Sequence, residues 1–202
     1  MKNLLLCIAT LFALSTVGFA QTVSNFNISE KMVNDAQKGW CGALVQINTT
    51  KETGGDYKEV ASNIIDAAYF YQNGPVLFKP TLTTGDQTFR MDKEGALAYF
   101  VGGNDKYKGD GGFALKGWKK CESKPRAFVL DGDTALSMGN VHMWNAKGEE
   151  TVVDKTWGYK LDKDGNLRIV LHHSSLPYKP AVAKVATMNK TQVTTRTKKI
   201  TR

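Results

Sequence analysis

The sequence predicts an α+β domain in which helices come first and an antiparallel sheet follows. Three observations predict it: amphipathic helical segments in the first half of the chain, strand-like runs after residue 126, and turn residues between those runs. A run of helices followed by a meander of strands is typical of this fold class. We expect the long first helix to lie across the sheet and to enclose a pocket between the two layers.

The helices are predicted from apolar residues at three- and four-residue spacing. The first covers residues 27–49, with Asn27 or Ser29 as its N-cap, and the second covers roughly residues 56–71. A short third helix is expected at residues 92–101. The apolar face of the first helix is predicted to consist of Met32, Ala36, Trp40, Ala43, Leu44 and Ile47.

Strands are predicted from runs of β-branched and aromatic residues. Residues 76–83 are expected to form a strand, and Pro80, which cannot donate to a sheet ladder, confines it to an edge or a bulge. Four later runs, separated by turn sequences such as Asp131-Gly132, are expected to pair as antiparallel hairpins. These runs are AFVL, TALSMGNVHMW, TVVDKTWGYKL and LRIVLHHSS.

The register of the last hairpin stays open at this point. A three-residue turn within residues 162–166 would place His173 on the face that carries Trp157 and Tyr159. A four-residue turn would place His172 and Ser174 on that face instead. A slip of one residue exchanges the two faces, so the spacing alone does not choose between the adjacent serines.

The ends of the chain differ in character from the domain. Residues 1–20 have the lysine, apolar core and small residues of a secretory signal peptide, which predicts a periplasmic or secreted protein. Residues 21–178 are expected to form the domain, and residues 179–202 a basic tail. In an oxidising compartment Cys41 and Cys121 could form a disulfide or remain two separate buried thiols.

The charge of the chain does not indicate a nucleic-acid partner. The formal net charge is +8, but seven basic residues and no acidic ones lie between Lys179 and Arg202. The domain without this tail is therefore close to neutral. The apolar segment at the N-terminus is too short for a spanning helix, so no membrane span is expected.

The three histidines do not form a convincing metal site. A catalytic zinc site needs three ligands on one side of the ion, and the chain contains only His142, His172 and His173. Neighbours on a strand point to opposite faces, so His172 and His173 cannot easily bind one ion. We therefore expect no protein-bound metal. The serines that follow lack the strand-to-helix elbow of a nucleophile.

Several segments resemble the iota-class carbonic anhydrases, which belong to the nuclear-transport-factor-like superfamily. These enzymes share a fold with the association domain of calcium/calmodulin-dependent protein kinase II. The matching stretches are FKPTLT (78–83), ALAYFVGG (96–103), VVDKTWGYKL (152–161) and LRIVLHHSSLP (167–177). The resemblance implies reversible hydration of carbon dioxide to bicarbonate by a homodimer. It also implies a cone-shaped α+β barrel, with a curved antiparallel sheet wrapped on the N-terminal helix. Some family members are described as manganese or zinc enzymes, and others as metal-independent.

In the metal-independent members a threonine, a tyrosine and a serine line the substrate pocket. These match Thr81, Tyr99 and Ser174. We expect Thr81 and Ser174 to orient the water and bicarbonate oxygens and Tyr99 to donate to a developing oxygen or to relay a proton.

Four further residues complete the predicted site. His172 is expected to carry the proton outward, because the ordinary pKa of histidine suits that task. Phe100 and Phe113 are expected to form an apolar wall, and Ser175 is a further candidate for contact with substrate. The alternative function is a non-catalytic ligand-binding or association module on the same fold, which would have no need of the three hydroxyls.

Overall fold

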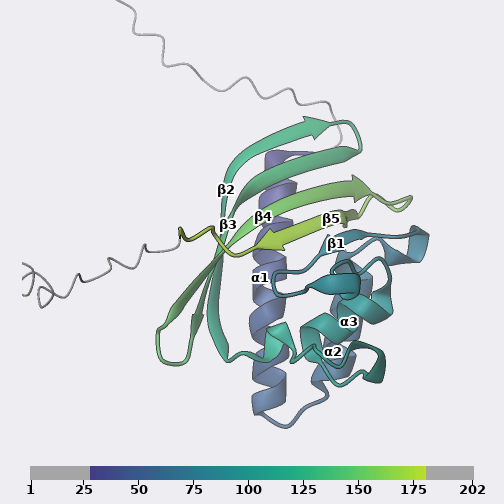
Figure 1. Cartoon of the computed structure of the whole chain (residues 1–202). Helices are drawn as coiled ribbons and strands as arrows, with labels where there is room; N and C mark the ends of the chain where they lie inside the picture. Colours follow the sequence, from purple (N-terminus) through teal and green to yellow (C-terminus); the bar gives the residue numbers. More distant parts are fainter. Residues whose placement is uncertain (1–27, 181–202) are drawn as a thin grey trace, which may run out of the picture.

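A computed structural model describes residues 28–180, so the predicted signal peptide and nearly all of the basic tail lie outside the described residues. Figure 1 shows α1 running along one face of a curved sheet, with α2 and α3 beside β1 and β5. The predicted α+β class is confirmed. No helix within residues 28–180 is long and apolar enough to span a membrane. The elements are α1 (Glu30–Glu52), α2 (Tyr57–Ala68), β1 (Leu77–Lys79), α3 (Lys93–Val101), β2 (Trp118–Asp131), β3 (Thr134–Asn145), β4 (Glu150–Leu161) and β5 (Leu167–Ser175).

The sheet agrees with the expected cone-like α+β fold, but it is open and not a closed barrel, and one of its strand pairs is parallel. Its strand order is β1-β5-β4-β3-β2, and β1 pairs with β5 in parallel. Pro80 directly follows the three-residue β1 and, lacking an N–H, cannot extend it. The edge strand is therefore shorter than residues 76–83. Its parallel pairing places the chain after Lys79 beside the end of β5.

Helix α1 begins after Ser29, one of the two predicted caps, and buries only Trp40, Leu44 and Ile47 of the predicted apolar face. Ser29 accepts a hydrogen bond from the backbone N–H of Met32, which satisfies one unpaired donor of the first turn. The buried stripe includes the polar Gln37, which donates to Ser137 Oγ on β3 and accepts from Ser123 Oγ on β2, both at 2.6 Å. These hydrogen bonds are the reason a glutamine is buried where hydropathy favours apolar residues. The buried residues are Val33, Gln37, Trp40, Cys41, Leu44, Ile47 and Asn48.

A β-bulge in β5 resolves the open register of the last hairpin. The Asp162 N–H donates to the Asn166 carbonyl, and Tyr159 pairs with Ile169, as a three-residue turn requires. The register then shifts by one residue, so that Trp157 pairs with His172. The bulge lies opposite Gly158, where a Cβ would meet the Leu171 Cβ at 2.9 Å. His172 and Ser174 consequently face the interior although the turn has three residues.

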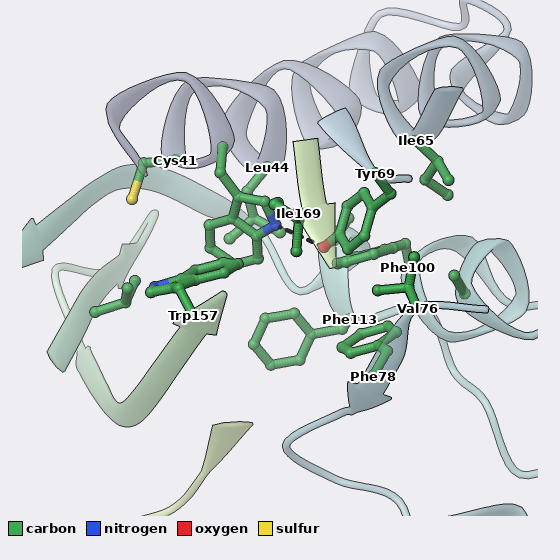
Figure 2. Close-up of a cluster of buried hydrophobic side chains, with 14 of the residues drawn as sticks. Cys41, Leu44, Ile65, Tyr69, Val76, Phe78, Phe100, Phe113, Trp157 and Ile169 are labelled. Carbon is green, nitrogen blue, oxygen red and sulfur yellow. Dashed lines mark hydrogen bonds between the residues drawn. The ribbon is translucent and has the colours of Figure 1, made fainter. Parts of the chain in front are cut away.

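Aromatic side chains fill the space between α1 and the sheet (Figure 2).

Cys41 on α1 forms a disulfide with Cys121 on β2, with the Cα atoms 5.1 Å apart. The bridge joins residues 80 positions apart, and in the chain-entropy model a loop of that length contributes about 4.5 kcal/mol to stability. Of the two alternatives for these cysteines, the structure has the disulfide and not two separate thiols.

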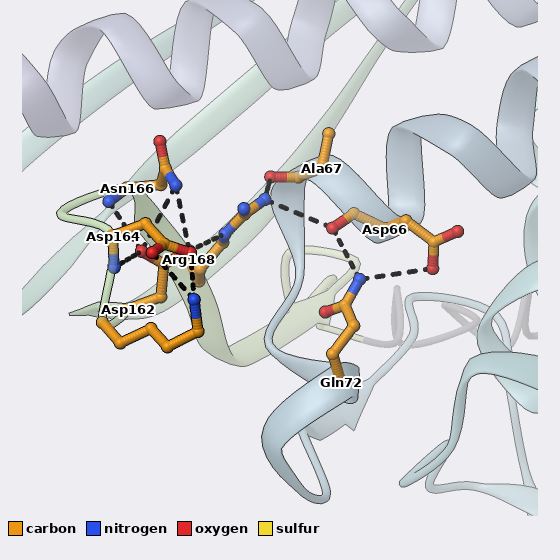
Figure 3. A network of polar contacts seen from close by, with 8 residues as sticks. Asp66, Ala67, Gln72, Asp162, Asp164, Asn166 and Arg168 are labelled. Carbon is orange, nitrogen blue, oxygen red and sulfur yellow. Dashed lines mark hydrogen bonds and ion pairs between the residues drawn. The ribbon is translucent and has the colours of Figure 1, made fainter.

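The β4–β5 hairpin is tied to the end of α2 by a network of polar contacts (Figure 3). The Asp162 carboxylate accepts from the backbone N–H groups of Asp164 and Asn166 and from Arg168 Nε at 2.8 Å. Arg168 holds the pKa of Asp162 well below its usual range. The Arg168 guanidinium also donates to the carbonyl of Ala67. Through Arg168, the turn of the hairpin is held against the C-terminal end of α2.

Candidate active site

The hydroxyls of Thr81 and Ser174 meet at the point where β1 and β5 run side by side. Thr81 Oγ1 and Ser174 Oγ are 2.6 Å apart, and either can be the donor. Both side chains are buried, and Ser174 is 0% exposed. Lys79 donates to the Ser174 carbonyl at 3.0 Å and holds the end of β5 in place. Two predicted site residues are therefore brought into direct contact.

Tyr99 is buried on α3 with its hydroxyl unpaired. Its ring stacks on Phe113 at a centroid distance of 5.4 Å and meets Phe78 edge-on at 5.8 Å. Tyr99 Oη has no hydrogen-bond partner within residues 28–180. Burial raises the pKa of Tyr99, and the nearby Thr81 lowers it by a smaller amount. The two hydroxyls do not, however, meet the geometry of a hydrogen bond. The hydroxyl therefore stays protonated and is available as a donor beside the Thr81–Ser174 pair.

A buried ion pair holds the loop that follows α3. Arg90 Nη1 and Nη2 donate to the two carboxylate oxygens of Asp110, and Nη1 also donates to the Gly95 carbonyl. The two charged side chains are only 3% and 8% exposed. Because Gly95 lies in the first turn of α3, the pair connects the glycine-rich loop to the helix that carries Tyr99.

Apolar side chains surround these polar groups. Phe100 and Phe113 are both buried, and Phe100 stacks on Phe78 at 5.8 Å. Phe100 also lines an apolar cavity of about 10 Å³ between α1 and α2, together with Trp40 and Tyr69. A cavity of that size is close to the minimum that holds one small molecule such as water. Phe100 and Phe113 both contact the ring of Tyr99, and their role as a wall for the substrate stays a prediction.

His172 is enclosed in a way that corrects one expectation. Its ring lies between Phe78, at 4.5 Å, and Trp157, at 4.2 Å, and the residue is 1% exposed. Nδ1 is 2.9 Å from Tyr69 Oη, and Nε2 is 2.6 Å from Lys155 Nζ. Burial lowers the pKa of His172 well below its usual value, and Lys155 lowers it further. The expectation of an ordinary pKa and of a direct path outward is therefore corrected: the lowered pKa favours the neutral imidazole, and the side chain is buried away from solvent.

Ser175 does not lie with the other predicted residues. Burial alternates along the end of β5: His173 is exposed, Ser174 is buried and Ser175 is partly exposed. Ser175 and His173 line a pocket on the outer face of the sheet together with Met138 and Asn140. The structure therefore separates the two serines, and only Ser174 reaches Thr81.

The remaining histidine takes no part in the site. His142 Nδ1 is 2.7 Å from Glu150 Oε1 on the neighbouring strand. Within residues 28–180 no group of three histidine, cysteine or acidic side chains is placed to hold a metal ion.

Sequence reasoning missed the partners of His172. Lys155 is 3% exposed, and Trp40 Nε1 donates to Tyr69 Oη at 3.1 Å. The pattern did contain a signal, because Lys155 alternates with Val153 and Trp157 on the buried face of β4. A lysine at an inward position of a strand is unusual and indicates a specific role.

The fold and the site together define an α+β protein with buried hydroxyls gathered against an aromatic core. The family model of the metal-independent carbonic anhydrases matches residues 31–176. A metal-independent carbonic anhydrase from Nostoc sp. strain PCC 7120 is 48% identical over 166 residues, which is 81% of this chain and 81% of that protein.

One solved structure agrees with this likeness. The iota-carbonic anhydrase from a cyanobacterium, crystallised with bicarbonate, is 48% identical, has a TM-score of 0.75 and is matched over 80% of this chain and 100% of that one. A protein from Xanthomonas campestris described as a calcium/calmodulin dependent protein kinase II association domain is 21% identical, with a TM-score of 0.48 and coverage of 81% and 95%. The chain belongs to the metal-independent carbonic anhydrases, as the family model and the 48% identity show.

Proposed function

We propose that this protein hydrates carbon dioxide to bicarbonate at the buried hydroxyls of Thr81, Ser174 and Tyr99. The observation that carries the assignment is the unpaired Tyr99 hydroxyl next to two hydroxyls that are bonded to each other. A buried polar atom without a partner is costly and indicates a ligand that completes it. The cyanobacterial relative was crystallised with bicarbonate, whose oxygens can accept a hydrogen bond from such a hydroxyl.

The three hydroxyls supply complementary functions. Ser174 and Thr81 both accept and donate, so together they orient a water whose oxygen attacks the carbon of the gas. Because Tyr99 keeps its proton, it donates to the oxygen that becomes negative as the new C–O bond forms. Phe78 and Phe113 keep bulk water away from the ring of Tyr99 and suit an uncharged substrate.

The adjacent serines provide a sharp test. We expect Ser174→Ala to lower kcat/KM for hydration by about 100-fold, because one oriented hydroxyl is lost from the transition state. Ser175→Ala, on the other face of the same strand, should retain the wild-type rate. Stopped-flow hydration assays on both variants decide the matter. Equal rates for Ser174→Ala and wild type would refute the assignment.

We also propose that the chain forms a homodimer through the outer face of its sheet. Val129, Leu136 and Met138 are exposed there, on paired strands, and exposed apolar side chains grouped on one face suit an interface between proteins. Met138→Lys should shift the protein toward the monomer in light scattering. Gln46→Lys, at an exposed position of α1 away from the outer face of the sheet, is the control and should leave the dimer intact.

Export is proposed with cleavage after Ala20. The Cys41–Cys121 disulfide supports it, because such bonds persist in oxidising compartments. Fractionation of the producing cell, followed by N-terminal sequencing of the mature protein, tests the location and the cleavage site together. A mature chain that still begins at Met1 would contradict the proposal.

A further inference from the structure

Hydration releases one proton for every bicarbonate formed, and the hydroxyl site has no group that can keep it. A water O–H bond breaks as the C–O bond forms, and the proton must pass to a base. Tyr99 and Tyr69 are already protonated, since burial raises the pKa of each. Serine and threonine hydroxyls are not bases at neutral pH. The acceptor therefore lies outside the three hydroxyls.

Two buried nitrogen bases lie directly beside this site. Lys155 is the register partner of Ser174 across β4 and β5, and both side chains point inward. Cross-strand partners have Cβ atoms about 5 Å apart. From there the lysine extends to His172, where Nζ is 2.6 Å from Nε2. We propose that Lys155, hydrogen-bonded to His172, is the proton acceptor of the hydration reaction, an inference that rests on the proposed function.

The hydrogen bonds favour an uncharged pair at rest. Tyr69 Oη accepts the Trp40 indole N–H, which leaves its own O–H to donate to His172 Nδ1. The imidazole then carries its hydrogen on Nε2 and donates it to Lys155 Nζ, and only a neutral amine has a lone pair to accept it. In this arrangement Trp40 donates to Tyr69, Tyr69 to His172 and His172 to Lys155. Burial lowers the pKa of Lys155 well below its usual value, consistent with a neutral amine.

The surroundings also support the protonated pair. Lys155 Nζ lies 4.4 Å from the ring centroid of Trp40 and 5.0 Å from that of Trp157, and aromatic faces attract an ammonium ion. On protonation Nζ donates to Nε2, and the imidazole hydrogen moves to Nδ1, facing Tyr69. The pair thus has two hydrogen-bonded states that differ by one proton. The proton taken from water resides on Nζ until it returns to solvent.

No carboxylate is bound to either member of the pair within residues 28–180. The rings in contact with the pair carry no charge: Trp40 from α1, Tyr69 after α2, Phe78 from β1 and Trp157 from β4. Two basic side chains lie nearby on the outer side. His173 lowers the pKa of His172, and Lys79 binds the Ser174 carbonyl. A base without an anionic partner gives up its proton more easily.

Substitution of Lys155 tests the inference. Lys155→Met keeps the length and apolar contacts of the stem but has no amine. We expect kcat to fall by about 100-fold, with KM for carbon dioxide little changed and with loss of the rise in kcat with pH that accompanies deprotonation of the pair. Lys160→Met, at an outward position of the same strand, is the matched control and should keep the wild-type pH profile.

Two further measurements separate proton acceptance from a structural role. Lys155→Ala leaves room for a small primary amine, and added methylamine should restore part of kcat in a concentration-dependent manner. In the unmodified protein, nitrogen-15 NMR of the Lys155 side chain should report a neutral amine at neutral pH. Wild-type kcat in folded Lys155→Met, absence of amine rescue, or a permanent ammonium signal would each overturn the inference. If Ser174→Ala is fully active while Lys155→Met is not, the proposed hydroxyl site fails instead.

Discussion

The hydroxyl oxygens of Thr81 and Ser174 lie 2.6 Å apart, although 93 positions separate the two residues in the sequence. Thr81 follows the shortest strand of the sheet, and Ser174 lies near the end of β5. Their contact depends on the parallel pairing of β1 with β5, which brings Phe78 opposite His172 and Lys79 opposite His173. The pair is therefore expected to act as one unit.

A double-mutant cycle tests that unit. Thr81→Val keeps the shape of the side chain and removes its hydroxyl, and we expect it and Ser174→Ala each to lower kcat/KM by about 100-fold. Since residues that act together are not additive, the double variant should be little worse than either single variant. Stopped-flow assays of the four proteins give the coupling energy. Independent, multiplying losses would contradict a joint role.

Tyr99→Phe should separate activity from stability. The substitution keeps the stacking on Phe113 and removes a buried hydroxyl that has no partner. Loss of an unsatisfied polar atom is expected to leave the free energy of unfolding unchanged or to raise it by about 1 kcal/mol. Hydration should nevertheless fall. Urea denaturation and stopped-flow assays on one preparation measure both, and a destabilised but fully active variant would contradict the prediction.

Lys155 should make stability depend on pH. The unfolded chain holds the lysine proton up to its ordinary pKa of 10.5, whereas the folded pKa is lowered. Between those two values unfolding takes up a proton, so the free energy of unfolding rises with pH. Lys155→Met should remove this slope and be more stable than wild type near neutral pH.

Urea denaturation at several pH values checks this prediction. The series should stay below pH 10.0, the ordinary pKa of tyrosine, because Tyr69 and Tyr99 have raised pKa values and act in the opposite direction above it. Parallel curves for the variant and wild type would show that the buried lysine is charged.

The ion pair between Arg90 and Asp110 should contribute more to stability than surface pairs do. Asp110→Asn leaves a buried guanidinium without its anion, and we expect a loss of about 3–5 kcal/mol. Asp35→Asn breaks the exposed pair with Lys31 and should cost less than about 1 kcal/mol. Thermal and chemical denaturation of the two variants provide the comparison. Similar losses would mean that Arg90 finds other partners.

Much of the architecture could be predicted from local patterns. Helix α3 begins after the cap Asp92, and β3 and β4 lie within a residue or two of the expected runs, because caps and period-two alternation are local signals. The start of β2 was missed. Its first half, from Trp118, is rich in lysine and interrupted by Pro125, where the register shifts, so it lacks the alternation that indicates a strand.

The site itself could be predicted only in part. The resemblance indicated Thr81, Tyr99 and Ser174, and the structure places their side chains together at the junction of β1, β5 and α3, while their roles stay predictions. The choice between Ser174 and Ser175 depends on the bulge opposite Gly158, which has no distinctive sequence pattern. Lys155 was passed over because hydropathy assigns lysine to solvent, and only the three-dimensional contacts show its partner.

The bulge also determines which change of length β5 can tolerate. Deletion of Val170 would remove the extra residue and leave Trp157 opposite His172, so the strand could straighten with its reactive face preserved. Deletion of Leu171 would have the same effect on pairing, although Val170 would then cover Gly158. Loss of a residue after His172 would bring Ser175 to the inward position and move every later side chain. A one-residue deletion in β5 is therefore expected to keep His172 and Ser174 inward when it falls at the bulge, and to change the residues after His172 when it falls beyond it.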